Sequence, residues 1–149
     1  MGEQMNARQK LVKMARGNKI ADLVLKNLNI VNVFTGEIEK GDIAIGEGII
    51  LGIGDYEGKN EVDYSGKTVI PGLIDGHVHI ESSMMTPTGF ARAVLPRGTT
   101  SVVADPHEIA NVCGLDGISY MLNASMKTPL DVYVMMPSCV PSTDFENAG

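Results

Sequence analysis

The sequence predicts an α/β fold, in which part of a small β-sandwich precedes the first strands of a parallel α/β barrel. Residues 21–53 hold short β-type runs separated by turn residues, whereas strand and helix patterns alternate later in the chain. Such alternation implies parallel strands joined by right-handed crossovers. We expect these strands at residues 69–79, 99–104 and 130–136.

The first part of the chain is expected to be one helix followed by several strands. Residues 3–16 have helical composition with a loose apolar stripe, and Gly17-Asn18 can end this helix. Regularly spaced short strands then suggest a small sandwich. We place these strands at residues 21–25, 29–33, 38–45 and 49–53.

The crossovers between the later strands are expected to be helical. We predict a helix over residues 88–95, closed by Arg97-Gly98, a short helical turn at 108–113 and a helix over 115–126. The predicted organisation is an N-terminal helix at 1–19, a partial β-sandwich domain at 20–68 and a partial barrel at 69–149.

Length and composition narrow the classes of protein. The chain has 149 residues, whereas a complete barrel of this type needs about 250. A net charge of −6 without a Lys/Arg cluster argues against nucleic acid as a partner. We find neither an apolar run of membrane-spanning length nor a secretory signal. The two cysteines, Cys113 and Cys139, suit the cytoplasm and are expected to be small buried apolar residues.

The richest chemistry follows the first barrel strand. Asp75, His77 and His79 occupy alternate positions, so their side chains point to the same face of an extended strand. Imidazoles and carboxylates together form a good ligand set for a divalent metal such as Zn, Mn or Fe. Such a metal can turn water into a nucleophile near neutral pH.

A second group of candidate residues follows the second barrel strand. Asp105, His107 and Glu108 come directly after residues 99–104, and Pro106 biases Asp105 toward an extended conformation. Two strands that each end in acidic and imidazole groups suggest one site at the C-terminal ends of the strands. That is where α/β barrels carry their chemistry.

Five short motifs extend this pattern into a resemblance. Pro-Gly-Leu-Ile-Asp-Gly-His-Val-His at 71–79 resembles the first barrel strand of the amidohydrolase superfamily, metal-dependent hydrolases built on a (β/α)8 barrel. The other four are similar to the adenine deaminase branch of that superfamily. They are Glu-Ser-Ser-Met at 81–84, Arg-Gly-Thr-Thr at 97–100, Asp-Pro-His-Glu-Ile-Ala-Asn-Val at 105–112 and Met-Pro-Ser-Cys-Val-Pro at 136–141.

The resemblance implies hydrolytic deamination of adenine to hypoxanthine and ammonia by a metal-activated hydroxide, as in purine salvage. It implies that His77 and His79 are metal ligands, with Mn or Fe as the metal and Zn as the alternative. Asp105, His107 and Glu108 are the candidate catalytic residues, which would bind substrate, a second metal or a water. For Glu108 the alternative is a charge that stabilises a helix N-terminus.

Four further residues are candidates for the surroundings of the site. Asp75 either holds the second ring nitrogen of a metal ligand or caps the end of its strand. Glu81, Ser82 and Ser83 either line the substrate pocket or, for the two serines, cap the next element.

The resemblance also implies that this chain is an incomplete N-terminal portion of a longer enzyme, which takes further ligands from later strands. We therefore expect residues 1–149 alone to be inactive and prone to aggregate. A purine is the expected partner, and a homo-oligomer is compatible with the full-length enzyme. The alternatives are an amidohydrolase acting on a cyclic amide, as dihydroorotases and hydantoinases do, or a non-catalytic module. The zinc nucleobase deaminases fit poorly because their Pro-Cys-x-x-Cys motif is missing.

Overall fold

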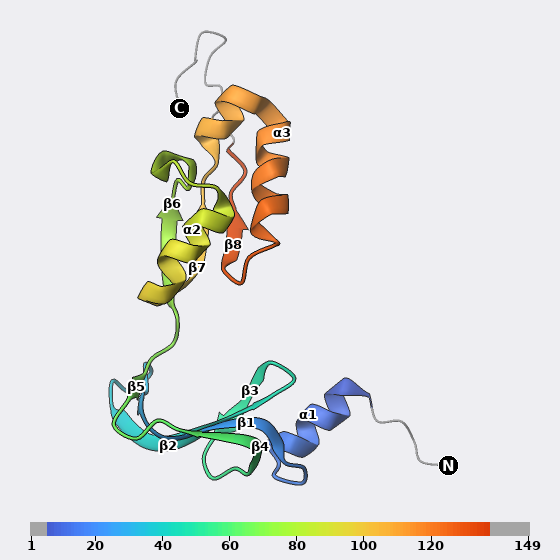
Figure 1. Cartoon of the computed structure of the whole chain (residues 1–149), viewed down its shortest axis with the longest axis vertical. Helices are drawn as coiled ribbons and strands as arrows, with labels where there is room; N and C mark the ends of the chain where they lie inside the picture. The colour runs from blue at the N-terminus through green and yellow to red at the C-terminus, as the bar shows by residue number, and fades with distance from the viewer. Residues whose placement is uncertain (1–5, 138–149) are drawn as a thin grey trace. The chain divides into compact units, whose positions relative to one another are not determined.

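The computed structural model of the chain describes residues 6–137 (Figure 1). It divides into two compact units, Met1–Pro71 and Gly72–Gly149. Cys139 and most of the 136–141 motif lie outside the described residues. Among the helices of residues 6–137, none combines the length and the apolar character that crossing a bilayer requires.

The first unit is a mixed five-stranded sheet with one helix beside it (Figure 1). The strand order is β3-β2-β1-β4, and β5 also pairs with β1. The β1–β2 and β2–β3 pairs are antiparallel, whereas β4 and β5 run parallel to β1. The elements are α1 (Ala7–Ala15), β1 (Ala21–Val31), β2 (Ile38–Gly46), β3 (Ile49–Ile53), β4 (Gly58–Asp63) and β5 (Thr68–Val69).

The helix α1 is held by a capping box and one buried side chain. Asn6 accepts a hydrogen bond from the main-chain N–H of Gln9, and the Gln9 side chain accepts one from the N–H of Asn6. Met14 is fully buried. The hydroxyl of Tyr56 donates to the carbonyl of Ala15 at 3.0 Å, which ties the end of the helix to the sheet's loops.

The strands of this sheet differ from the sequence prediction in two ways. The predicted strands at 21–25 and 29–33 are one strand, β1, with an irregularity between Leu25 and Leu28. At that point Asn27 has a φ of 60°, and its main-chain N–H donates to Asp42 Oδ1 at 2.8 Å. The sequence prediction also missed β4, because its residues Gly-Lys-Asn-Glu-Val-Asp lack an apolar alternation.

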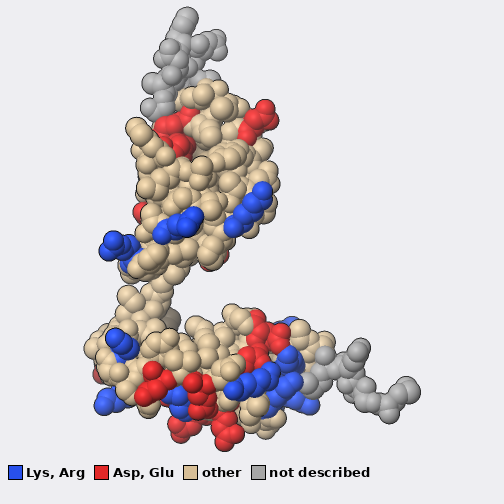
Figure 2. Space-filling view, in the orientation of Figure 1, with Lys and Arg blue, Asp and Glu red and all other residues tan. Residues whose placement is uncertain are grey.

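Three ion pairs lie within the described part of the first unit. Lys26 lies 2.5 Å from Asp42, Lys59 lies 2.6 Å from Asp22, and Lys10 pairs with Glu47. On the face drawn in Figure 2, basic and acidic side chains of this unit are interspersed.

The second unit is a three-stranded parallel sheet with helical crossovers, as the sequence predicted for the opening of an α/β barrel (Figure 1). The strand order is β6-β7-β8. Its elements are β6 (Leu73–Val78), η1 (Glu81–Ser83), α2 (Pro87–Val94), η2 (Leu95–Arg97), β7 (Thr99–Ala104), α3 (His107–Ser125) and β8 (Asp131–Val134). The buried core is Ile80, Phe90, Ala91, Val102, Ala104, Met121 and Leu130.

The prediction of one strand over residues 69–79 is wrong. Val69 pairs with Ile30 in the first sheet, whereas Leu73 pairs with Thr99 in the second. Pro71 has no N–H to donate to a ladder. At Gly72 the backbone passes so close to Thr100 that an added Cβ would lie 2.0 Å from Oγ1. The last strand of the first sheet therefore ends before Pro71-Gly72, and the first strand of the second sheet begins after it.

The α-helices α1, α2 and α3 lie where the sequence predicted helical segments but differ from them in their bounds, and the short helices η1 and η2 were not predicted. The predicted turn at 108–113 and helix at 115–126 are both present within α3, which breaks at Gly114 with φ 57° and ψ −141°. Only glycine adopts this conformation without strain. Cys113, expected to be buried, is exposed beside this break, so that prediction is wrong.

Candidate metal centre

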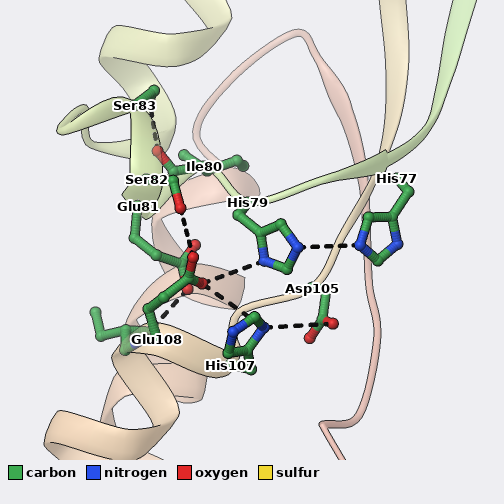
Figure 3. Close-up of polar contacts among 10 residues, drawn as sticks. His77, His79, Ile80, Glu81, Ser82, Ser83, Asp105, His107 and Glu108 are labelled. Atoms are coloured by element: carbon green, nitrogen blue, oxygen red, sulfur yellow. Dashed lines mark hydrogen bonds and ion pairs between the residues drawn. The ribbon is translucent and has the colours of Figure 1, made fainter. Parts of the chain in front are cut away.

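The ends of β6 and β7 are tied together by their main chains. The N–H of Asp105, the residue after β7, donates to the carbonyl of Val78, the last residue of β6, at 2.9 Å. The residues that follow are thereby brought together at the C-terminal edge of the sheet, as Figure 3 shows for His79, Asp105 and His107.

All three histidines converge on this edge. His77 Nε2 and His79 Nε2 lie 3.0 Å apart. The ring of His79 lies between the other two, with centroids 4.8 Å from His77 and 4.6 Å from His107, and both contacts are edge-to-face. His77 is exposed, whereas the side chains of His79 and His107 are 26% and 33% exposed. The site is therefore partly shielded and open on one side.

Two carboxylates complete this group. Glu108 Oε2 lies 3.2 Å from His79 Nδ1 and 3.8 Å from His107 Nδ1. Asp105 Oδ2 lies 3.6 Å from His107 Nδ1. The other oxygen of Asp105, Oδ1, is buried and has no hydrogen-bond partner.

The short helix η1 attaches to the beginning of α3 at two points (Figure 3). Ser82 Oγ donates to Glu108 Oε1, and the N–H of Ile109 donates to Glu81 Oε1 at 3.3 Å. Ser83 instead donates to the carbonyl of Ile80 at 2.5 Å, within its own turn. The residue Ile80 is fully buried and anchors this turn in the core.

The carboxyls of Glu81 and Glu108 have opposite pKa shifts. Burial raises the pKa of Glu81, and the negative charge of Glu108 adds to that rise. Burial also acts to raise the pKa of Glu108, but the hydrogen bond from Ser82, the Glu108 main-chain N–H and the nearby imidazoles lower it below its usual range. As the pH rises, Glu108 therefore loses its proton first, and Glu81 keeps its proton to higher pH.

The donor set fits a divalent metal ion. Two groups of three ligand atoms lie within 4.8 Å of one another: His77, His79 and Asp105, and His79, His107 and Glu108. Two nitrogens bound at about 2.0–2.1 Å to one tetrahedral ion lie roughly 3.3 Å apart, close to the 3.0 Å between His77 and His79. A metal ion would also supply the partner that the buried Asp105 Oδ1 lacks.

In the described part of the chain, the remaining candidate, Asp75, bonds to a main-chain N–H and to no imidazole nitrogen. Asp75 is exposed, and its Oδ1 accepts a hydrogen bond from the main-chain N–H of His77 at 3.1 Å. Sequence reasoning did not identify the two main-chain groups that hold the site together, the carbonyl of Val78 and the N–H of Ile109. No side-chain identity marks them, so the sequence carries no signal for their role.

Comparison with known proteins agrees with this geometry. Three relatives named adenine deaminase are similar to nearly the whole chain. The protein of Clostridium acetobutylicum is 60% identical over 138 residues, 93% of this chain and 24% of its own length. The protein of Geobacillus kaustophilus is 64% identical over 129 residues, which are 87% of this chain and 22% of the relative's own length. The protein of Kosmotoga olearia is 59% identical over 140 residues, which are 93% of this chain and 24% of the relative's own length.

The chain thus spans about a quarter of the length of the curated relatives it matches. The model of the Amidohydrolase family matches residues 68–149, more than half of the chain and all of the strands and helices around the candidate metal centre. With imidazoles and carboxylates gathered at the strand ends of a parallel sheet, the chain belongs to the amidohydrolase family.

Proposed function

We propose that the gene product in which this chain occurs hydrolyses adenine to hypoxanthine and ammonia. The observation that supports it most is the gathering of His77, His79, Asp105, His107 and Glu108 at the ends of β6 and β7. The names of the relatives supply the substrate, and their identity of 59–64% includes the segment that carries these residues.

The metal ligands of the proposal are His77, His79 and Asp105. Their donor atoms lie within 4.8 Å of one another, and neutral imidazoles with carboxylates suit Mn, Fe and Zn. We propose Mn or Fe, with Zn as the alternative. When bound, a divalent ion supplies the Lewis acidity that makes water nucleophilic near neutral pH.

Glu108 is the proposed proton carrier. In the reaction, water adds its oxygen at C6 of adenine. The C6–N bond breaks and the amino group leaves as ammonia with one proton of that water, while the other proton ends on the ring nitrogen of hypoxanthine. A carboxylate that is ionised near neutral pH can accept a proton and pass it to the leaving nitrogen. Glu108 meets this requirement because Ser82 and the imidazoles favour its charged form. His107, beside both Glu108 and Asp105, is proposed to hold the substrate or a water.

The test is adenine hydrolysis by the gene product loaded with Mn(II) or Fe(II). We expect ammonia and hypoxanthine to appear in equal amounts, and dihydroorotate and hydantoin to remain intact. The Glu108→Gln variant is expected to lose roughly 10²- to 10⁴-fold in kcat, the usual contribution of a positioned acid–base group. Glu37→Gln, an exposed change in the first unit, is the matched control.

Two results would overturn the proposal. Hydrolysis of a cyclic amide without reaction of adenine would identify a different amidohydrolase, and a metal-loaded protein that hydrolyses none of these substrates would indicate a non-catalytic module.

We further propose a role in purine metabolism in the cytoplasm, with homo-oligomerisation of the full-length protein. Neither nucleic acid nor a membrane is a proposed partner.

A further inference from the structure

Ser82 in η1, Glu108 in α3 and His79, just after β6, form one line of contacts into the candidate metal centre. Ser82 Oγ in η1 donates to Glu108 Oε1 in α3, and the other oxygen, Glu108 Oε2, lies 3.2 Å from Nδ1 of His79. On its far side, His79 presents Nε2 to the Nε2 of His77 at 3.0 Å (Figure 3).

The contact with Glu108 determines where the proton of His79 lies. A neutral imidazole carries one N–H, and an ionised carboxylate can only accept. The 3.2 Å contact therefore holds the N–H on Nδ1 of His79, and Nε2 keeps its lone pair. Only a nitrogen with a free lone pair can bind a metal, so this tautomer prepares His79 as a ligand through Nε2.

The orientation of the Glu108 carboxyl group depends on a neighbouring side chain. The last torsion of a glutamate side chain is broad, so the carboxyl turns easily unless something holds it. Its Oε2 also has a second imidazole nearby, with His107 Nδ1 at 3.8 Å. The hydroxyl of Ser82 holds the opposite oxygen, Oε1, and thereby leaves Oε2 facing His79.

The position of Ser82 is itself well supported. The preceding residue, Glu81, accepts the main-chain N–H of Ile109, so η1 is attached to the first turn of α3 next to Glu108. The following residue, Ser83, bonds within the turn to Ile80, which is buried in the core. The hydroxyl of Ser82 is therefore held at a constant place relative to the carboxyl it contacts.

We propose that Ser82 is a positioning residue that acts through Glu108 to hold His79 in its Nδ1–H tautomer, ready to bind a metal through Nε2. The inference rests on the proposed metal-dependent function. It assigns to Ser82 a role in metal binding that is separate from any contact with substrate.

The test compares the wild-type gene product with Ser82→Ala and Ser82→Thr. The first readout is the ¹⁵N signals of the imidazole of His79 in the metal-free protein, assigned by their loss in a His79→Gln variant. The second is the affinity for Mn(II). The matched control is Ser65→Ala, because Ser65 Oγ also donates to a carboxylate, Asp63, at 2.7 Å in the other unit.

We expect Ser82→Ala to convert the single His79 tautomer to a mixture and to weaken Mn(II) binding about tenfold, at the lower end of the effect of an outer partner. Ser82→Thr keeps the hydroxyl and is expected to retain both wild-type values, as is Ser65→Ala. A Ser82→Ala protein with unchanged tautomer and affinity would overturn the inference. A wild-type protein that binds no divalent metal would instead overturn the proposed function, and the tautomer readout would still decide the role of Ser82.

Discussion

The main-chain N–H of Asp105 donates to the carbonyl of Val78 at 2.9 Å, and this bond extends the pairing of β6 with β7 to the point where the candidate metal centre begins. It explains how a motif after one strand meets a motif after the next. His79 follows Val78 directly, and His107 lies two residues beyond Asp105, so both rings are brought to a centroid distance of 4.6 Å. Substitutions of the individual histidines at this edge should therefore weaken metal binding to different degrees.

His79 is the only histidine that belongs to both possible ligand groups of the described residues. Replacing His79 with Ala should therefore weaken divalent metal binding more than replacing His77 or His107. We expect a loss greater than the roughly 10- to 100-fold typical of an outer partner. Metal content after equilibrium dialysis at several free metal concentrations measures it. Equal losses for all three histidines would contradict the shared role of His79.

Gly72 should tolerate no side chain. A Cβ there would lie 2.0 Å from Thr100 Oγ1, so Gly72→Ala must displace β6 or β7. We expect the free energy of unfolding to fall by about 1–3 kcal/mol, the usual cost of overpacking. Gly76→Ala, within β6 itself, is the matched control, since nothing lies within 4 Å of its added Cβ. Urea denaturation of the two variants compares them, and equal midpoints would contradict the prediction.

The Lys26–Asp42 pair should make the stability of the first unit depend on pH. Burial acts to raise the pKa of Asp42, but the hydrogen bonds from Lys26 and from the Asn27 main chain outweigh it and lower that pKa. A carboxyl whose pKa is lower in the folded state stabilises the fold above its unfolded pKa, about 3.9. This contribution is then lost as the pH falls through the lower, folded value.

The same pair acts in the opposite sense at high pH. The hydrogen bond to Asp42 raises the pKa of Lys26, so its contribution is present below the unfolded lysine pKa and is lost as the pH rises through the folded value. Asp42→Asn should remove both effects and lower the stability of the first unit near neutral pH, because the neutral amide cannot form the ion pair with Lys26. Thermal melts between pH 3 and 11, roughly the span of these titrations, test it, with exposed Asp131→Asn as the control. An unchanged pH profile in Asp42→Asn would contradict the assignment.

Residues 1–149, expressed alone, should aggregate. In the described part of the chain, β6 and β8 are the edges of the parallel sheet, and they expose Leu73, Ile74 and Tyr133 at 50%, 71% and 62%. Unpaired edges with apolar side chains favour intermolecular pairing. Light scattering and dye binding to exposed apolar surface measure it. A soluble monomer with one cooperative melting transition would contradict this prediction.

The same 149-residue chain should release no measurable ammonia from adenine with Mn(II) or Fe(II). Each ligand group of the described residues offers only three donors and shares His79 with the other group. Metal binding should therefore be weak in the isolated chain. Ammonia release above a metal-free blank would overturn this expectation, and Glu108→Gln serves as the inactive reference.

Local patterns in the sequence were enough for much of the second unit. The strand predicted at residues 99–104 is confirmed as β7, and the predicted helix at 88–95 is α2, one residue earlier. These elements follow from a short apolar run and from Thr86 and Pro87, which start a helix by capping and by a preset backbone. Gly114 likewise marked the break between two helical segments.

Other features depend on contacts between residues far apart in the chain. Residues 69–79 read as one strand because periodicity is local, yet Val69 and Leu73 pair with different sheets. The polar strand β4 pairs with β1 without an apolar pattern of its own. Hydrogen bonding between distant strands can override the local preference of a segment. A short stretch of sequence does not contain the distant partner, so this pairing cannot be predicted from it.

By itself, the sequence determined which residue types could bind a metal, because the two-residue period of a strand places His77 and His79 on one face. It also determined the parallel order of the later strands through their helical crossovers. Only the tertiary structure decided that Glu108 contacts His79 while Ser82 holds the other oxygen of that carboxyl. The physical reason is distance along the chain: these groups lie 26 and 29 residues apart, and only the close approach of strand ends, tied by main-chain hydrogen bonds, brings them within reach.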